Sequence, residues 1–394
     1  MCILINSLTS GGGEKVAITL CEQYKKKGIN VFFVCLERDD HYTLDHKIYY
    51  LSKHKGENRS NVKKLFYLFI FALRLKKFLR EKNIPFVQSH LNRANYVNVF
   101  AGMFGSKHHA QLVNHGIVGR YESYKNLTGK INLFLTKWLY GKADQVILAS
   151  KGMMLDLKKL GRFQNDLTVI NNPFDIENIT DMSRESVKED EFIFDERKKY
   201  LIAVGRLEKV KRITDIIMAI AMIRKRSSDV ELIILGDGPE KRNINDFIQR
   251  LGIGQIIHLL GDVKNPFKYI SRADALVSAS EYEGFCNVIV EALISGTAVI
   301  STDCESGPRE ILAPGTDVRI KLKPGEIEFT EFGVLVPVGD HESLARAITE
   351  LLSDVNRLKH YSENGIKRAI DFDKTVIAEK YMSKFEPMMA ETSI

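Results

Sequence analysis

The chain has 394 residues, more than one ordinary hydrophobic core holds, so two domains of roughly 150–200 residues each are expected. A hydrophobic share of 44% and a charged share of 27% describe an ordinary soluble globular protein. The net charge of +7 is uneven, because residues 1–180 carry 27 Lys and Arg against 14 Asp and Glu, and the remainder 30 against 36. The first half is therefore the part expected to meet an anionic surface.

The cysteines and histidines argue against stabilisation by disulfides or by a bound metal. Five cysteines are an odd number without CxxC spacing, which excludes a disulfide framework and a structural zinc site and favours a reduced, cytoplasmic setting. The first strand begins at Met1, so no signal peptide is expected ahead of it. Three histidines (His41, His46 and His54) lie in polar loops without ligand spacing, and no metal site is expected there.

The first predicted strand, Met1 to Ser7, runs into a glycine loop and then a helix to about Lys27. Glycines such as Gly12 and Gly13 at a strand-to-helix turn let the backbone approach a phosphate. The spacing is neither a Walker loop nor a GxGxxG fingerprint, so packing around a helix cap remains an alternative. Further strands are expected at Val31 to Leu36 and Lys47 to Leu51.

A basic, aromatic helix is predicted between Asn58 and Lys82. Its apolar run, Leu65 to Leu73, is too short to cross a bilayer. Aromatic bulk with a basic edge favours contact with an anionic membrane, and a helix packed on the sheet with a solvated edge stays open as the alternative. The cations proposed for the membrane are Lys63, Lys64, Lys76 and Lys77. A second helix around Lys137, Trp138, Tyr140 and Lys142 is expected to extend this face.

The next strands bring one histidine to the edge of the predicted sheet. Phe86 to His90 reads as a strand, and Ala110 to Gly116 as another that ends on His115. Open α/β sheets bind ligands at the carboxyl ends of their strands, so His115 is a functional candidate. Arg120, in the following loop, is a weaker functional candidate.

The second half repeats strand, loop and helix. Tyr200 to Val204 leads into Arg206 and Lys211, a bidentate fork and a point charge suited to a diphosphate; a solvated charged loop is the alternative. Two later strands end in tight loops, at Gly236 and at Val263.

The most informative stretch runs from Ser278 to Leu293. It predicts the end of a buried strand, a glycine turn and a helix that opens near Gly284. Amides at a helix N-terminus form a seat for phosphate, here around Phe285 and Cys286. Glu283 and Glu291 bracket that seat as acceptors for hydroxyl groups, although each could be a plain surface residue.

The string Glu-Gly-Phe-Cys-Asn-Val-Ile-Val-Glu at 283–291 resembles the signature of the retaining GT-B glycosyltransferases of family 4. The Gly-Arg-Leu-x-x-x-Lys motif at 205–211 and the glycine loop resemble other motifs of that family, with Arg212 standing where its usual glycine would be. Residues 306–310 resemble a loop of transferases that build bacterial glycans on lipid carriers.

The resemblance implies an α/β architecture of two doubly wound Rossmann-like domains facing a cleft. Residues 1–172 would bind the acceptor, residues 173–370 the nucleotide-sugar, and residues 371–394 would form a helix that crosses back onto the first domain. The implied catalytic residues are His115, Arg206, Lys211 and Glu283. The implied donor-binding residues are Gly12, Gly13, Gly236, Val263, Glu283, Gly284, Phe285, Cys286, Asn287 and Glu291. The implied acceptor or membrane residues are Arg120, Lys63, Lys64, Lys76 and Lys77.

The expected function is that of a retaining glycosyltransferase. It would move a hexose or N-acetylhexosamine from a UDP-sugar to a lipid-linked saccharide, as a peripheral protein on the cytoplasmic face of the membrane. No metal or other cofactor is expected, and Asp371-Phe-Asp373 is better explained by helix capping. A non-hydrolysing UDP-sugar epimerase and a non-enzymatic binding protein remain alternatives. A dehydrogenase lacks its GxGxxG turn, and no fold motif for nucleic acid accompanies the basic charge.

Overall fold

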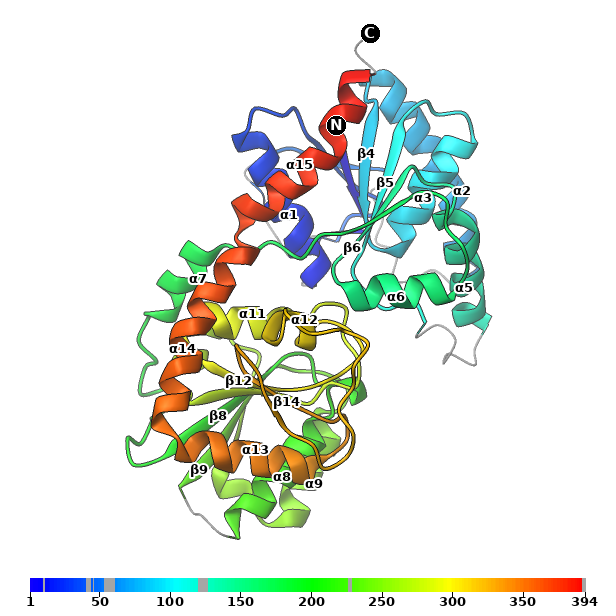
Figure 1. The fold of residues 1–394 in the computed structure, drawn as a ribbon. Coiled ribbons are helices and arrows are strands. Elements are labelled where there is room, and N and C mark those ends of the chain that lie inside the picture. Colours follow the sequence, from blue (N-terminus) through cyan, green and yellow to red (C-terminus); the bar gives the residue numbers. More distant parts are fainter. Residues whose placement is uncertain are drawn as a thin grey trace. The chain divides into compact units, whose positions relative to one another are not determined.

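The structure is a computed structural model that describes residues 1–9, 11–39, 44, 46–52, 61–119, 127–225 and 229–391, without the side chains of 61–64 and 389–391. The chain divides into two compact units (Figure 1). Unit 1 comprises Met1–Phe174 and Lys374–Ile394, and unit 2 comprises Asp175–Asp373. The predicted divisions were at residues 172 and 370.

Unit 1 is built on a seven-stranded, all-parallel sheet with the order β3-β2-β1-β4-β5-β6-β7. Its strands are β1 (Cys2–Ile5), β2 (Phe32–Cys35), β3 (Ile48–Tyr50), β4 (Phe86–His90), β5 (His109–Asn114), β6 (Gln145–Leu148) and β7 (Asp166–Val169). The central strands are almost completely buried, as expected for a parallel sheet covered by helices on both faces.

Helices cover both faces of this sheet. On one face lie α1 (Gly12–Lys26) and the returning helix α15 (Lys374–Glu391), and on the other lie α2 (Asn61–Glu81), α3 (Asn92–Met103) and α5 (Leu127–Tyr140). Helix α6 (Lys151–Lys159) follows β6. The apolar side of α15 completes the core, with Tyr381 and Phe385 buried and the Phe385 ring 5.2 Å from that of Tyr24.

Unit 2 repeats the topology with the order β10-β9-β8-β11-β12-β14-β13, in which only β13 runs antiparallel. Its strands are β8 (Lys199–Val204), β9 (Val230–Leu235), β10 (Ile257–Gly261), β11 (Ala275–Ser278), β12 (Ala298–Thr302), β13 (Glu328–Phe329) and β14 (Val334–Val336). Helices α8 (Ile213–Arg224), α9 (Lys241–Leu251) and α13 (His341–Ser353) pack on one face. Helices α7 (Ile176–Ser183), α10 (Phe267–Ile270), α11 (Asn287–Ile294), α12 (Pro308–Leu312) and α14 (Val355–Ala369) lie on the other side. Short 3₁₀ turns occur at Lys209–Lys211, Gly254–Ile256 and Ile370–Phe372.

Each sheet has one point at which its strand order reverses, between β1 and β4 in unit 1 and between β8 and β11 in unit 2. Ligands of open α/β sheets bind at such points, beside the carboxyl ends of the strands. Three of the four non-glycine residues with positive φ in the described part of the chain lie in the loops there: Leu91, Arg212 and Cys286. Strained backbone of this kind is common at functional sites, so these loops are candidates for a ligand site.

Candidate functional site

The centre of the candidate site in unit 2 is an ion pair between two predicted residues. The Lys211 Nζ donates to Glu283 Oε1 at 2.6 Å, and Ser280 Oγ donates to the same oxygen at 2.6 Å. Both charged side chains are largely buried, at 26% and 13% exposed. Burial by itself lowers the pKa of the Lys211 ammonium, but the Glu283 carboxylate beside it outweighs this and holds that pKa above its ordinary value. Lys211 is therefore a fixed positive charge.

The loop that carries Lys211 is tied to the loop that carries Glu283. The Glu281 N–H donates to the carbonyl of Val210 at 2.8 Å, which brings the ends of β8 and β11 together. Arg206 lies on the same loop, but its side chain is 72% exposed and its Nε lies 3.2 Å from Glu208 Oε1. Among the described residues, Arg206 therefore forms no hydrogen bond or ion pair with Lys211 or Glu283.

Gly236 and Val263 lie at the ends of the neighbouring strands β9 and β10. The Gly236 N–H donates to the carbonyl of Gly261 at 2.7 Å, so these loops form a continuous rim with the Arg206 loop. Gly236 has φ +128°, and a Cβ there would lie 2.0 Å from the Gly205 carbonyl oxygen. Only glycine permits this approach of the two loops.

The helix after Glu283 begins later than predicted. Helix α11 starts at Asn287 with Cys286 as its N-cap in the left-handed conformation (φ 69°, ψ 65°), whereas the sequence indicated a start near Gly284. The first-turn amides therefore begin at Asn287, and the partly buried Glu291 lies in the second turn of the helix. The prediction was wrong because a left-handed residue ends the turn without any glycine to signal it.

The side chains of Phe285 and Cys286 face the interior. The Phe285 ring packs edge-on against Phe372 at 5.5 Å, and the Cys286 Sγ lies 3.9 Å from Ser278 Oγ. Burial raises the pKa of the Cys286 thiol well above its ordinary value, so the thiol stays protonated. These two residues can offer a ligand only their backbone.

Residues 303–309 brace this turn, a role that the sequence alone does not predict because it depends on partners distant along the chain. The Ser306 hydroxyl donates to the Gly284 carbonyl at 2.6 Å, and a Cβ on Gly307 would lie 2.3 Å from the Phe285 carbonyl. Arg309 is 2% exposed and holds Asp303 through two hydrogen bonds, at 2.9 and 2.7 Å. A buried bidentate pair of this kind fixes the loop.

In unit 1 the structure brings the glycine loop and His115 together. A Cβ on Gly13 would lie 3.2 Å from the His115 ring and 2.8 Å from Leu91, while Gly12 is exposed at the start of α1. His115 in turn meets a second histidine, since its Nε2 lies 3.0 Å from Nδ1 of the fully buried His90. The position of His90 at the end of a strand was a usable sequence signal, the same one that singled out His115.

The predicted membrane residues fall on two parts of the chain. Arg120 lies outside the described residues, as do the side chains of Lys63 and Lys64. Lys77 is 71% exposed and 3.8 Å from Glu81, but Lys76 donates from Nζ to the Phe104 carbonyl at 2.5 Å and is half-buried. No described helix is long and apolar enough to span a membrane.

The two predicted basic helices share one aromatic surface, which we call the aromatic face: Phe66, Phe69 and Leu73 of α2 with Phe134 and Trp138 of α5, exposed by 41–72% together with Leu127. The buried ring of Phe100 in α3 packs against two of them, 4.9 Å from the Phe69 ring and 6.0 Å from the Trp138 ring. Tyr140, expected on this face, is instead fully buried and donates to Asn92 at 3.1 Å.

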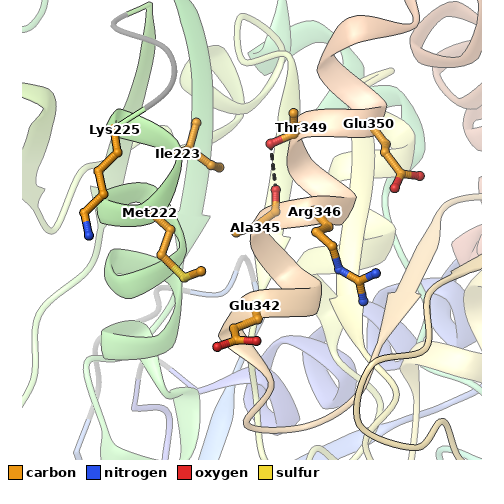
Figure 2. A pocket seen from close by; sticks show the side chains of 8 residues that line it. All are labelled: Met222, Ile223, Lys225, Glu342, Ala345, Arg346, Thr349 and Glu350. Carbon is orange, nitrogen blue, oxygen red and sulfur yellow. Dashed lines mark hydrogen bonds between the residues drawn. The ribbon is translucent and has the colours of Figure 1, made fainter.

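A hollow of about 580 Å³ lies elsewhere in unit 2, between the end of α8 and α13 (Figure 2). It is lined by Met222, Ile223, Lys225, Glu342, Ala345, Arg346, Thr349 and Glu350. None of the candidate site residues lines it. Among the residues that the structure covers, no three His, Cys, Asp or Glu side chains gather as metal ligands do.

Two doubly wound sheets of this topology, with a buried cation and glycine loops at their switch points, match the arrangement expected of a GT-B glycosyltransferase. Residues 10–178 match the family model described as Glycosyltransferase Family 4, and residues 185–368 match Glycosyl transferases group 1. A protein of Campylobacter jejuni, named as an N-acetylgalactosamine-N,N'-diacetylbacillosaminyl-diphospho-undecaprenol 4-alpha-N-acetylgalactosaminyltransferase, is 32% identical over 380 residues, 95% of this chain and 96% of its own. The chain belongs to the group 1 glycosyltransferases of family 4.

Solved structures share the fold at low identity. Sucrose-phosphate synthase from Thermosynechococcus elongatus superimposes with a TM-score of 0.79 at 19% identity, covering 99% of both chains. Anabaena HepE in complex with UDP-glucose gives 0.75 at 19% identity, covering 98% of this chain and all of that one. The GT-B fold predicted from the sequence is therefore confirmed.

Proposed function

We propose that this glycosyltransferase moves a hexose or N-acetylhexosamine, with retention, from a UDP-sugar to a lipid-linked saccharide at the cytoplasmic face of the membrane. The observation that carries the donor side is the buried Lys211–Glu283 pair at the switch point of unit 2. The acceptor is supported by the Campylobacter jejuni relative, whose name gives a diphospho-undecaprenol acceptor. UDP is supported by HepE, solved with UDP and with UDP-glucose.

The charge at Lys211 suits the step that breaks the anomeric C–O bond. That step puts negative charge on the leaving diphosphate, and a preorganised cation stabilises it more in a partly dry site than in water. Glu283 holds the ammonium in place before the donor binds, and Ser280 in turn donates to the Glu283 carboxylate. The exposed Arg206 would add a bidentate contact once a phosphate is present.

We assign no side-chain nucleophile to this reaction. A short-lived ion pair on one face of the sugar, with a donor phosphate oxygen taking the acceptor proton, needs only fixed cations and amides. We propose that the N-terminal end of α11, which begins at Asn287, supplies these amides. We propose that no divalent metal is required, because Lys211 and Arg206 supply the positive charge.

Alanine variants test this assignment. Lys211→Ala and Arg206→Ala are each expected to lower kcat by about 100-fold or more, as losing one electrostatic donor often does. Lys209→Ala is the matched control, since Lys209 is an exposed cation on the same 3₁₀ turn as Lys211. Near-normal turnover in both site variants would overturn the proposal.

The donor is tested by thermal shift with UDP-, GDP- and ADP-sugars, since a ligand that binds only the folded state raises Tm. UDP-sugars are expected to give the largest shift, and a larger shift with another nucleotide would refute the UDP assignment. Incubation of the UDP-sugar without any acceptor separates transfer from epimerisation, because only an epimerase would convert it.

The membrane part of the proposal rests on the aromatic face. Contiguous exposed aromatic side chains on a soluble unit mark an interaction surface, and basic residues beside them favour anionic lipid. Lys77 and Arg80 follow Phe66, Phe69 and Leu73 along the same exposed stripe of α2.

Flotation with phosphatidylglycerol vesicles tests that contact. Phe69→Ser with Trp138→Ser is expected to reduce the floated fraction several-fold, and Lys77→Gln less. The control is Ile193→Ser with Val355→Ser, which removes two exposed apolar residues of unit 2. Equal flotation of the aromatic and control variants would exclude the aromatic face as the membrane contact.

A further inference from the structure

A row of buried amides crosses the sheet of unit 1. Gln88 on β4, Gln111 on β5 and Gln145 on β6 are direct register partners, and Asp166 on β7 is the partner of Gln145. The three glutamines are at most 1% exposed. Buried amides in a parallel sheet are costly unless every one is hydrogen-bonded, so this row calls for an explanation beyond packing.

The end of the row at Asp166 sets the direction of its hydrogen bonds. Burial raises the pKa of the Asp166 carboxyl, but hydrogen bonds from Gln145 and Thr168 and the charge of Lys384 outweigh this and hold it below its usual range. An ionised carboxylate only accepts hydrogen bonds. Gln145 must therefore donate from Nε2 to Asp166 Oδ2, at 2.6 Å, which turns its Oε1 toward Gln111.

The same orientation passes along the row. Gln111 donates from Nε2 to Gln145 Oε1, and Gln88 donates from Nε2 to Gln111 Oε1, each at 2.5 Å. The second N–H of Gln88 meets Tyr24 Oη at 3.2 Å. The Oε1 of Gln88 lies 3.2 Å from His90 Nε2 and 3.4 Å from Tyr24 Oη, and as an amide oxygen it can only accept a hydrogen bond from the imidazole.

The two histidines continue the sequence of donors. Burial, followed by the neighbouring His115, holds the pKa of His90 well below its ordinary value, and burial lowers the pKa of His115 to about 4. Both rings are therefore neutral at pH 7. With its proton on Nε2, His90 has a bare Nδ1, which accepts from His115 Nε2 at 3.0 Å. His115 is then left with a bare Nδ1.

That last nitrogen has no other role among the described residues. The His115 Nδ1 is buried and without a hydrogen-bond partner there. A buried acceptor without a donor is destabilising, and a bound group that donates a hydrogen bond to it would offset that cost.

We propose that Asp166, Gln145, Gln111, Gln88 and His90 are positioning residues that fix the tautomer of His115, leaving its Nδ1 as an acceptor for a hydroxyl group of the substrate. A chain of side-chain hydrogen bonds thus connects the partly exposed carboxylate of Asp166, on β7, to the switch point of the sheet. A phosphate oxygen, which offers no proton at pH 7, is not the partner of this nitrogen. The assignment of a substrate hydroxyl as the partner of Nδ1 rests on the proposed glycosyltransferase function, whereas the assignment of the His115 tautomer does not.

Nitrogen NMR of the full chain labelled with ¹⁵N-histidine tests the tautomer directly, because a bare ring nitrogen resonates far from a protonated one. The His115 signals are identified by their loss in His115→Gln. The wild type is expected to show a protonated Nε2 and a bare Nδ1. A protonated Nδ1 in the wild type would overturn the proposal without touching the proposed function.

Two variants distinguish the effect of the hydrogen-bonded row from the effect of the Asp166–Lys384 ion pair at its end. Asp166→Asn is isosteric and can donate as well as accept, so both directions of the row become possible. We expect a second set of His115 signals with Nδ1 protonated. Lys384→Gln removes the same 3.4 Å Asp166–Lys384 ion pair but leaves the carboxylate, and is expected to keep the wild-type tautomer. Equal spectra for the two variants would refute the coupling.

Kinetics connect the tautomer to the substrate. If about half of the Asp166→Asn molecules hold the wrong tautomer, kcat/KM is expected to fall about twofold, in proportion to the competent fraction. Lys384→Gln is expected to leave it unchanged. A change of tautomer without a change in kcat/KM would refute the hydroxyl contact at Nδ1. The absence of transferase activity in the wild type would instead refute the proposed function.

Discussion

The two units share one sheet topology and differ in what stands at its switch point. Unit 2 presents a fixed ion pair, Lys211 with Glu283, beside an exposed arginine. Unit 1 presents two neutral histidines beside a glycine loop. The same backbone plan therefore supports a charged site in one unit and an uncharged, hydrogen-bonding site in the other.

Because the strand order is the same in both units, the contrast lies in the side chains that each unit brings to its switch point. A buried cation favours a group that gains negative charge, such as a leaving diphosphate. A neutral imidazole favours hydroxyl groups, because it can accept from them without a charge of its own. Four sets of variants test this contrast. They concern the glycine backbone, the ion pair, the titration of His115 and the strained Arg212, in decreasing order of the expected change in free energy.

The backbone contrast gives the largest expected effect. Gly236→Ala would set a Cβ 2.0 Å from the Gly205 carbonyl at φ +128°, and we expect it to destabilise unit 2 by about 4 kcal/mol. Gly315→Ala is the control, since no atom lies within 4 Å of a Cβ there. Urea unfolding measures both, and equal midpoints would show that the glycine rim tolerates a side chain.

The charge contrast is tested by Glu283→Gln. The variant can still accept from Ser280 and Lys211 but no longer holds the ammonium by charge, so kcat is expected to fall about 30-fold, or about 2 kcal/mol. Glu281→Gln, at an exposed neighbouring position, is the control and is expected to be near normal. If the two variants had the same turnover, the ion pair would have no part in the reaction.

The titration contrast concerns unit 1. Because the pKa of His115 is about 4 in the folded chain and about 6.5 in the unfolded one, the unfolded state binds more protons below pH 6.5. Stability is therefore complete above pH 6.5 and is lost as the pH falls toward 4. His115→Gln is expected to reduce this loss by about 1.5 kcal/mol, which is less than the full pKa shift implies because the residue is only partly buried.

Denaturant unfolding at pH 7 and pH 4.5 measures that difference. His360→Gln is the control, since His360 is exposed in unit 2. If His115→Gln lost as much stability between the two pH values as the wild type does, His115 would not be the neutral, buried group described here.

The smallest expected effect concerns the residue that departs from the family motif. Arg212 has φ 47° and ψ 40°, a left-handed conformation that costs a side chain about 1 kcal/mol, and its Nε is 2.6 Å from Asp215. Arg212→Gly loses the ion pair and relieves the backbone, so its unfolding free energy is expected to stay within about 0.5 kcal/mol of wild type. Arg212→Ala is expected to be less stable than Arg212→Gly by about 1 kcal/mol, and the reverse order would contradict the strain.

The sequence by itself determined the alternation of strands and helices, because buried parallel strands and their covering helices leave distinct apolar patterns. It also determined which residues follow the strands: His115 and Gly236 come directly after β5 and β9, and Lys211 and Glu283 lie in the loops after β8 and β11. These features are local, so a short window of the chain contains them.

Only the tertiary structure decided how distant residues are paired. The start of α11 at Asn287, the engagement of Lys76 by the Phe104 carbonyl and the burial of Tyr140 depend on neighbours far along the chain. The row from Asp166 to His90 is the clearest case, because three glutamines on separate strands become neighbours only through the register of the sheet. Register is set by packing of the whole unit, and no single strand carries it.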